Sequence, residues 1–474
     1  MGGGLLQLIA VGQIDEFLSI NPDLSFYQYV YKRHTSFAME SRQLSFQKMP
    51  VLAPSNTGNI YDCTIIRYGD LLNGLFFCFQ LPEIYSSDKY RFKWIQNVGT
   101  HIIKKASVYI DGILIDQLTG EWMNIWNELS LSSNDTKTDS VIGNFNYLQN
   151  PTLSVPRVTI KNNKFIYNYY PTTTKESNVP SIPSHNVVIP LNFWFTRNPA
   201  LALPILRLQL NVVTVRIELE SSEKLYQVYA SDLEIYVSPA YFNDLYGESI
   251  NIYTFTKPFS IYPYIEANFV FLGEDERNTL FLKSKLTYLV EQLTINTPQA
   301  ISSSSSASFN INVIVNNPTK ELIWTLKRDD YVRYNELTNY SAYIPENPNA
   351  GILDKAILKF NNNNRFEEKS AEYFHMIQPY QYHSKIPRQG IYTYSFAIYP
   401  EKEFISGYFN AAVVKTTLSL NIKNIYDNSK INKKLVAFKK APYEFNYLAT
   451  VYCLNYNIFE IVGNQAGLKF TIST

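Results

Sequence analysis

The stretch VYIDGILI, residues 108–115, places two short apolar runs on either side of an Asp111-Gly112 pair. Asp and Gly both tolerate the positive φ angles of a two-residue type I′ turn, whose twist suits antiparallel strands. We therefore predict a β-hairpin with its turn at Asp111 and Gly112. This is the clearest local signal in the chain, and the sequence around it repeats the same kind of structure.

Strand patterns recur on both sides of this hairpin. Residues 75–81 (LFFCFQL) are apolar at almost every position, which predicts a strand buried on both faces. Apolar and polar side chains alternate in residues 309–316, and apolar side chains recur at every second position in 418–422 and 468–472, as in half-buried strands. In residues 208–219 the apolar positions change from even to odd, which predicts one strand with a bulge or a sharp twist.

Helical patterns are few. Residues 121–129 (EWMNIWNEL) predict a short amphipathic helix laid over a sheet edge or a loop, because Trp122, Met123, Trp126 and Leu129 fall at helical spacing. Residues 280–293 predict a second helix, whose apolar face is formed by Leu282, Leu286, Leu289, Val290 and Leu293. The longer gaps, residues 131–180 and 325–385, are expected to be extended surface loops.

Composition points in the same direction. Of the 474 residues, 46% are hydrophobic and only 18% are charged, with 37 Tyr and 29 Phe. Many short strands and few helices predict an all-β sandwich or barrel fold. The length suits two large β units, and a division near residues 221–262 leaves two halves that are each large enough for an eight-stranded jelly roll. Few charges and many aromatic side chains also suit surfaces buried against other subunits.

Several functional classes find no support in the sequence. A net charge of +1 gives no electrostatic footprint for direct nucleic-acid binding, and the densest basic stretch, residues 430–440, is interpreted as a solvated loop or strand edge. Cys63, Cys78 and Cys453 show no C-x-x-C spacing, which argues against a disulfide framework or a zinc site and for a reducing compartment. The sequence contains no run of 18 or more apolar residues, so it predicts no membrane-spanning helix.

Catalytic and metal-binding residues are not apparent either. None of the histidines shows the spacing of a metal-ligand pair; they are His34, His101, His185, His375 and His383. His34 is expected to pack and form hydrogen bonds. Glu274, Asp275 and Glu276 could serve acid–base chemistry, but a role at the start of a helix is favoured, because acids stabilise its N-terminal N–H groups. We nominate no catalytic residue, no metal site and no cofactor.

Two sequons make possible N-glycosylation sites: Asn134-Asp-Thr136 and Asn339-Tyr-Ser341, both in expected loops. A protein assembled in the cytoplasm would not meet the glycosylation machinery of the secretory pathway, so a chance match is the favoured interpretation of both.

Four long blocks of sequence are shared, in the same order, with one protein family: residues 2–46, 106–129, 191–219 and 267–293. Shorter shared elements are Asn21-Pro22, Phe193-Trp194-Phe195, Arg197-Asn198-Pro199, Tyr394-Ser395-Phe396, Ser406-Gly407 and Asn455-Tyr456-Asn457. In this combination the chain resembles the major capsid proteins of the nucleocytoplasmic large DNA viruses, the icosahedral group that includes iridoviruses, phycodnaviruses and their giant relatives.

The resemblance implies two consecutive jelly rolls with a few short helices in loops. The expected organisation is an N-terminal arm (1–24), a first jelly roll (25–221), a linker and extension (222–262) and a second jelly roll (263–474). Three such chains would present six similar modules, so a homotrimer could tile a hexagonal lattice as a capsomer of an icosahedral shell. The expected location is therefore the virion shell, assembled in the host cytoplasm.

The resemblance also implies partners. Neighbouring capsomers would contact the trimer at its edges, and the N-terminal arm would lie at the capsomer base, toward minor capsid proteins or an internal membrane. The candidate assembly residues are Leu5, Leu6, Ile9, Phe17, Arg33 and His34.

Two alternatives stay open at this point. Ser406-Gly407 follows Ile405, where the family has a proline, and the C-terminal glycines are thinned to Gly463 and Gly467. These departures are compatible with a minor capsid or penton-type paralogue of the same fold. A carbohydrate-active enzyme built from paired jelly rolls is a more distant alternative; it would need two carboxylates about 5–9.5 Å apart in a cleft.

Overall fold

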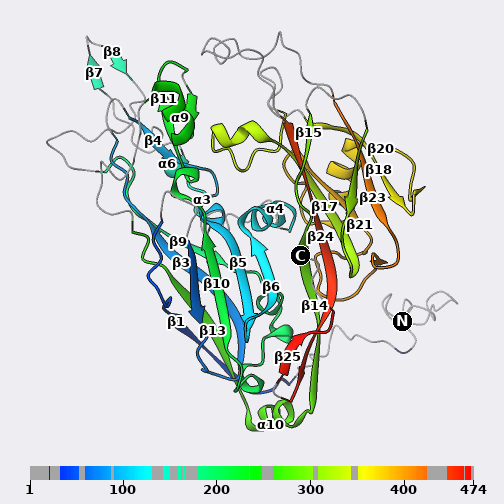
Figure 1. The fold of residues 1–474 in the computed structure, drawn as a ribbon. Coiled ribbons are helices and arrows are strands. Elements are labelled where there is room, and N and C mark those ends of the chain that lie inside the picture. The colour runs from blue at the N-terminus through cyan, green and yellow to red at the C-terminus, as the bar shows by residue number, and fades with distance from the viewer. Residues whose placement is uncertain are drawn as a thin grey trace, which may run out of the picture.

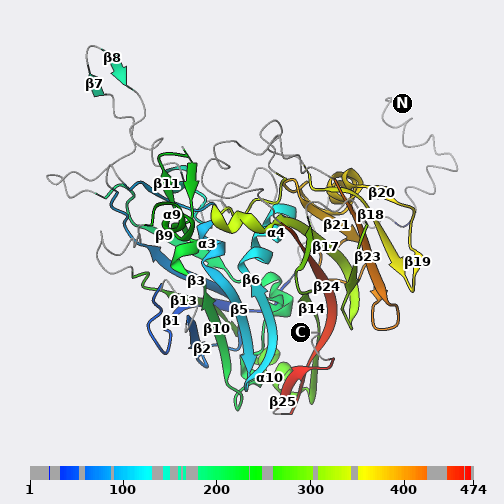
Figure 2. The ribbon, with the colours of Figure 1, turned by 45° about the horizontal axis from the view of Figure 1, so that its top comes forward.

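The computed structural model describes residues 21, 33–52, 59–86, 90–130, 142–149, 159–161, 164–166, 180–233, 235–247, 260–302, 308–342, 351–423, 446–463 and 465–470. Their fold is two β-sandwiches that stand side by side (Figure 1). Figure 2, turned by 45°, shows the same two units next to each other. In the described part of the chain, no helix is long and apolar enough to cross a membrane.

The first sandwich consists of two four-stranded antiparallel sheets. One has the strand order β1 (Phe37–Leu44), β13 (Tyr264–Leu272), β3 (Leu71–Leu81) and β9 (His185–Pro190). The other has the order β2 (Ile60–Thr64), β10 (Val213–Leu219), β5 (Ile103–Ile110) and β6 (Ile113–Thr119). Residues 75–81 lie in β3 and are buried or half-buried on both faces, as the sequence predicts.

The second sandwich has the same plan. The main path of one sheet is β14 (Lys285–Ile295), β24 (Asn446–Val462), β17 (Pro318–Arg328) and β21 (Ile391–Ser395), with the short strands β15 (Gln299–Ser302), β22 (Phe409–Asn410) and β25 (Gln465–Leu468). The other sheet follows β16 (Phe309–Val313), β23 (Thr416–Ile422), β18 (Leu353–Phe360) and β19 (Asn363–Asn364), with β20 (Lys369–Ser370) beside β18. The prediction of an all-β chain of two eight-stranded jelly rolls is confirmed.

Smaller elements cover the ends of the sandwiches. A third sheet above the first sandwich has the order β12 (Ile235–Val237), β11 (Tyr226–Ala230) and β4 (Phe92–Trp94), and β7 (Thr159–Lys161) pairs with β8 (Lys164–Ile166) (Figure 1). The α-helices among the described residues are α3 (Val98–His101), α4 (Gly120–Ser130), α6 (Asn146–Gln149), α8 (Trp194–Arg197), α9 (Pro239–Tyr246), α10 (Glu274–Leu282) and α11 (Gln378–Tyr382). The remaining turns are η1 (Pro199–Leu201), η2 (Ile205–Arg207), η3 (Ser222–Lys224), η5 (Asp329–Arg333) and the π-helical η6 (Tyr373–Ile377).

The predicted hairpin is present. β5 and β6 are antiparallel neighbours, and the turn residues Asp111 and Gly112 have φ angles of 49° and 81°. The Asp111 carboxylate accepts hydrogen bonds from Val212 N at 2.7 Å and from the Asn211 side chain, so the turn is also tied to the loop before β10. The local turn chemistry was therefore sufficient to predict this element.

The predicted helix over residues 280–293 is wrong. Helix α10 ends at Leu282, and β14 pairs with β24 from Lys285↔Val462 to Ile295↔Tyr452. β14 contacts apolar groups on both of its faces, so its hydrophobic residues do not alternate, and their spacing imitates a helix. Glu274, Asp275 and Glu276 do occupy the first turn of α10, in agreement with their favoured interpretation.

Two further expectations need correction. The change of apolar parity in residues 208–219 marks the start of β10 at Val213; the preceding residues form a turn, and Leu210 is 71% exposed. A bulge does occur in β10, but later, between Glu218 and Leu219. Residues 325–385 are not one extended loop, because they contain β18, whose Ala356 and Leu358 lie in the second core.

Sheet pairing also bears on where the two halves meet. β13 pairs with β1 and with β3, so Tyr264–Leu272 are hydrogen-bonded into the first sandwich, although the expected boundary assigns them to the second. The chain changes sandwich after this strand, through α10 at the lower end of the molecule in Figure 1.

Candidate functional site

The two sandwiches of the described chain meet at an extensive buried junction. β24 is buried along most of its length because each of its faces has a different neighbour. Val451 and Cys453 point into the core of the second sandwich, whereas Tyr452 and Leu454 join the apolar cluster of the first. The two jelly rolls therefore share a continuous apolar contact and form one packed unit.

Helix α4 lies within this junction (Figure 1). The indole of Trp122 stacks on that of Trp126 with ring centroids 5.5 Å apart, and it lies 5.6 Å from the ring of Tyr452 in β24. The amphipathic helix predicted at residues 121–129 is confirmed, and its apolar face contacts the neighbouring sandwich as well as its own.

A buried ionic cluster crosses the junction beside these aromatic rings. Arg197, at the end of α8, pairs through Nη1 with Glu291 Oε2 of β14 at 2.9 Å. The other oxygen of Glu291 accepts from Lys320 Nζ of β17, whose side chain is 0% exposed. Two cations from different sandwiches thus share one carboxylate. Their attraction to Glu291 offsets the free energy that is lost when the three charged groups are removed from water. Burial lowers the pKa of Lys320, and the charge of Glu291 opposes this shift.

Asp116 lies next to this cluster on β6. Its carboxylate accepts from Trp194 N at 3.2 Å and from Gln117 N at 2.9 Å. Burial raises the pKa of Asp116 to about 6, against the opposing charge of Arg197. Asp116, Arg197 and Glu291 also line a small cavity of about 20 Å³, a volume that suits a single water molecule.

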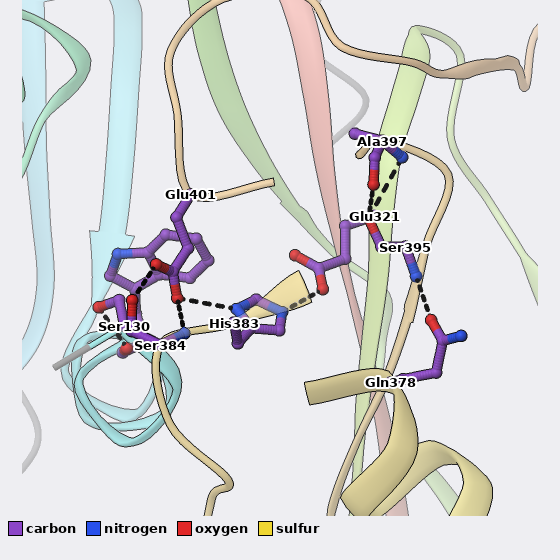
Figure 3. Close-up of polar contacts among 9 residues, drawn as sticks. Ser130, Glu321, Gln378, His383, Ser384, Ser395, Ala397 and Glu401 are labelled. Carbon is purple, nitrogen blue, oxygen red and sulfur yellow. Dashed lines mark hydrogen bonds and ion pairs between the residues drawn. The ribbon is translucent and has the colours of Figure 1, made fainter. Parts of the chain in front are cut away.

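A second buried cluster surrounds His383 (Figure 3). The imidazole bridges two carboxylates, with Nε2 2.6 Å from Glu321 Oε1 and Nδ1 3.2 Å from Glu401 Oε1. Burial alone would lower the pKa of His383, but Glu321 and Glu401 raise it to about 9. The side chains of His383 and Glu321 are both 0% exposed, so a charged imidazole is held inside the protein at neutral pH.

The local sequence explains how two adjacent charges come to be buried. Lys320 and Glu321 are neighbours on β17, and the pairing of β17 with β24 is irregular between Thr319 and Glu321. A bulge of this kind re-aims side chains and is common near functional positions. Lys320 therefore bonds to Glu291, while Glu321 bonds to His383.

Further polar contacts join the rim of the junction. Gln292 Nε2 donates to the carbonyl of Ile115 at 2.8 Å. This hydrogen bond satisfies a backbone acceptor on β6, which is an edge strand of its sheet. On α4, Glu128 accepts from Arg388 at 2.7 Å. The two rolls are held by directional bonds as well as by apolar contact, so their relative orientation is fixed.

The chemistry of this junction is that of ion pairing. The deeply buried carboxylates Glu291 and Glu321 each bind a cationic side chain, whereas Asp116, which is equally buried, accepts from backbone N–H groups. Over the residues that the structure describes, no group of three or more His, Cys, Asp or Glu side chains is placed to hold a metal ion. The arrangement can fix two modules rigidly, and His383 and Asp116 can make that rigidity depend on pH.

The sequence-predicted site residues lie elsewhere. Arg33 and His34 are exposed just before β1, and His34 Nδ1 lies 2.7 Å from the carbonyl of Thr35. Asn339 is half-buried; it bonds to Glu336, and its Oδ1 accepts from Ser341 Oγ of the same sequon at 2.8 Å. The other candidates fall outside the described residues: Leu5, Leu6, Ile9, Phe17 and Asn134.

Sequence reasoning missed the residues of the ionic clusters. A weak signal for them exists, since Lys320-Glu321 and Glu291 interrupt otherwise apolar strand segments. A charge inside a buried strand requires a partner, but the sequence does not say which residue supplies it. The position of His383 in the sequence gives no sign of a partner, so its role as the bridge between two carboxylates needed the tertiary structure.

Both halves of the chain match known families. Residues 25–253 match the major capsid protein N-terminus family, and residues 276–467 match the family described as the large eukaryotic DNA virus major capsid protein. The major capsid protein of Phaeocystis pouchetii virus is 28% identical, over 99% of this chain and 100% of the relative. That of Pyramimonas orientalis virus is also 28% identical, again over 99% of this chain and 100% of the relative.

A solved structure shares the fold. The chain resembles the crystal structure of PBCV-1 VP54, as fitted into a reconstruction of the virophage Sputnik, with a TM-score of 0.67 and 22% identity over 94% of this chain and 100% of that chain. These matches extend over nearly the whole chain. The fold of two consecutive, packed sandwiches agrees with them. The chain belongs to the family of major capsid proteins of large eukaryotic DNA viruses.

Proposed function

We propose that this capsid protein forms homotrimers that act as pseudo-hexagonal capsomers of an icosahedral shell. The observation that carries this proposal is the rigid pairing of two similar sandwiches in one chain. Three such chains arranged around a threefold axis present six similar modules, which suits a hexagonal lattice. Each interface within an obligate trimer would have to bury well over about 2,000 Å².

The described surface offers apolar side chains for such contacts. One group lies in the segment that follows β21 and includes Ile398 (63% exposed) and Val413 (75% exposed). Another lies at the lower end of the molecule in Figure 1, where α10 ends with Leu282 (80% exposed). Where such side chains form a contiguous patch, they mark protein interaction sites.

The lower end also receives the chain that precedes β1. Gly273 N, just before α10, donates to the carbonyl of Ser36 at 3.1 Å, so the described chain enters β1 at this end. We assign the arm, residues 1–24, to contacts with minor capsid proteins or an internal membrane, through Leu5, Leu6, Ile9 and Phe17 at its apolar positions and Arg33 and His34 nearby. We further propose that the rest of the chain divides into a first jelly roll (25–221), a linker and extension (222–262) and a second jelly roll (263–474). Strand β13 lies within the last range but pairs with strands of the first sandwich.

The same proposal covers location and activity. Trimers would assemble in the host cytoplasm and then form the virion shell together with neighbouring capsomers. The chain would act there as a structural component, without catalysis, cofactor or direct nucleic-acid contact. In that location Asn134 and Asn339 would not meet the glycosylation machinery of the secretory pathway, and mass spectrometry of virion-derived protein tests this.

Sedimentation equilibrium of the purified chain is the direct test of the trimer. We expect a mass three times the 54.7 kDa of one chain at micromolar concentration, and hexagonal arrays when the trimer is concentrated. A folded monomer that stays monomeric at micromolar concentration would contradict the proposal. Copy number in purified particles separates a dominant shell protein from a minor or penton-type paralogue, since the former would be the most abundant polypeptide.

A further inference from the structure

A polar cleft lies at the upper end of the molecule in Figure 1, between the third sheet of the first sandwich and the segment that follows η5 in the second. Its volume is about 670 Å³, and one wall carries Lys93, Gln96, Gln149 and Gln227. The opposite wall is formed by residues 335–341 together with Arg388 and Gln389. This end is remote from α10 and the start of β1.

Lys93 is a poorly compensated cation in this cleft. Its ammonium lies 4.2 Å from the centroid of the Tyr236 ring, and burial lowers the pKa of Lys93. Among the described residues, no carboxylate oxygen comes within ion-pair distance of Nζ; Glu336 acts on it only as a more distant charge. A partly desolvated ammonium without a bonded anion favours the binding of one from solution.

The cleft also has amide groups available for hydroxyl groups. Gln96 Oε1 accepts from Thr338 Oγ1 at 3.1 Å and from Arg388 Nη1 at 3.0 Å, while its N–H groups have no acceptor in the described structure. Gln149 shows the reverse: its amide donates to Asn144 Oδ1 at 2.6 Å, and its own oxygen has no donor there. Donors and acceptors therefore stand side by side, as recognition of sugar hydroxyls requires.

Aromatic side chains extend the same surface. Tyr229 and Tyr236 face each other across β11 and β12 with ring centroids 5.2 Å apart, and Arg91 lies over Tyr229. Arg91 immediately precedes β4 and Lys93 lies within it; their cationic groups lie over the rings of Tyr229 and Tyr236, respectively. The surface beside the cleft thus combines cations with tyrosine rings, a combination suited to an anionic ring-shaped ligand.

We propose that this cleft binds an acidic sugar, with the carboxylate or sulfate of the sugar on Lys93 Nζ and its hydroxyl groups on the amides of Gln96 and Gln149. The inference deepens the proposed function, since in a shell whose arm faces inward this end faces outward, toward a host surface. We expect one cleft to bind weakly because it makes few contacts with the sugar. Many copies of the cleft in one shell would raise the overall avidity.

The test is titration calorimetry of the purified full-length protein with glucuronate, glucose and inorganic sulfate. We expect saturable binding of glucuronate and at least about tenfold weaker binding of glucose and of sulfate. Lys93→Met keeps the aliphatic stem and removes the charge, and Gln96→Glu places a negative charge in the cleft; each should weaken glucuronate about tenfold or more. Lys415→Met and Gln299→Glu make the same changes outside the cleft and should leave affinity unchanged.

The outcomes separate cleanly. The proposal would be overturned if glucuronate showed no saturable binding, or if both cleft variants bound glucuronate as tightly as the unaltered protein. It would also be overturned if glucose bound as tightly as glucuronate. Sulfate binding as tight as glucuronate would overturn its sugar part and leave a simple anion site. The oligomeric state is measured on the same sample, so a monomer that binds glucuronate would contradict the trimer and support the cleft.

Discussion

The junction and the outer flank of the second sandwich use the same residue types in opposite settings. At the junction, the side chains of Glu291 and Lys320 are only 5% and 0% exposed. On the flank, Lys355 and Glu368 are 49% and 36% exposed and form their pair at 3.2 Å. From this difference we expect the burial of an ion pair, more than its geometry, to decide what its loss costs in stability.

The largest effect is expected from Glu291→Gln. The substitution leaves Arg197 and Lys320 as buried cations without a carboxylate, and we expect a loss of about 3–5 kcal/mol in the free energy of unfolding. Urea denaturation at one fixed protein concentration measures it. The matched change on the flank is Glu368→Gln; equal losses in the two variants would show that the junction is not energetically distinct.

The pH dependence of stability sharpens the comparison. His383 has a folded pKa of about 9, above its ordinary 6.5, so its contribution is complete below pH 6.5 and is lost as pH rises through 9. A shift of this size corresponds to about 3 kcal/mol. Asp116 has a raised pKa of about 6, so stability also falls as pH rises from 4 to 6.

The His383 shift predicts a protein that is less stable at pH 9 than at pH 6.5. Urea midpoints measured across this range should fall, and His383→Asn should flatten the decline. An unchanged slope in that variant would show that His383 does not report on the junction.

Backbone packing gives a third contrast. Gly390 has φ +95°, and an added Cβ would lie 2.1 Å from the carbonyl oxygen of Tyr340. We expect Gly390→Ala to cost about 2–3 kcal/mol, because it adds strain and a clash with backbone at the edge of the junction. Gly463, with φ +58° and open space around it, should lose only about 1 kcal/mol in the same substitution. Equal urea midpoints for the two variants would contradict this reasoning.

The smallest effect belongs to the flank itself. Lys355→Met removes an exposed partner whose charge is screened by water, and we expect a change of about 0–1 kcal/mol that shrinks further in high salt. The same urea experiment with and without added salt measures it. A loss above about 2 kcal/mol would mean that this pair is covered in the purified protein, for example by another subunit.

Much of the fold could be predicted where one local signal decided the structure. The turn at Asp111 and Gly112 follows from backbone chemistry, and the burial of residues 75–81 follows from a run of apolar side chains. β14 could not be predicted in this way, because it contacts apolar groups on both faces and its spacing imitates a helix. β18 lies in the stretch 325–385 that was expected to be an extended loop, yet its alternate residues Ala356 and Leu358 are buried.

The sequence by itself determined the strand-rich fold class, the hairpin at Asp111 and Gly112, the helix over residues 121–129 and the family resemblance. Only the tertiary structure decided how the two sandwiches are joined. Arg197, Glu291 and Lys320 come from α8, β14 and β17, and His383 meets Glu321 and Glu401 from other segments again. A charged residue in a buried strand indicates that a partner is required. Which residue becomes that partner depends on long-range strand pairing.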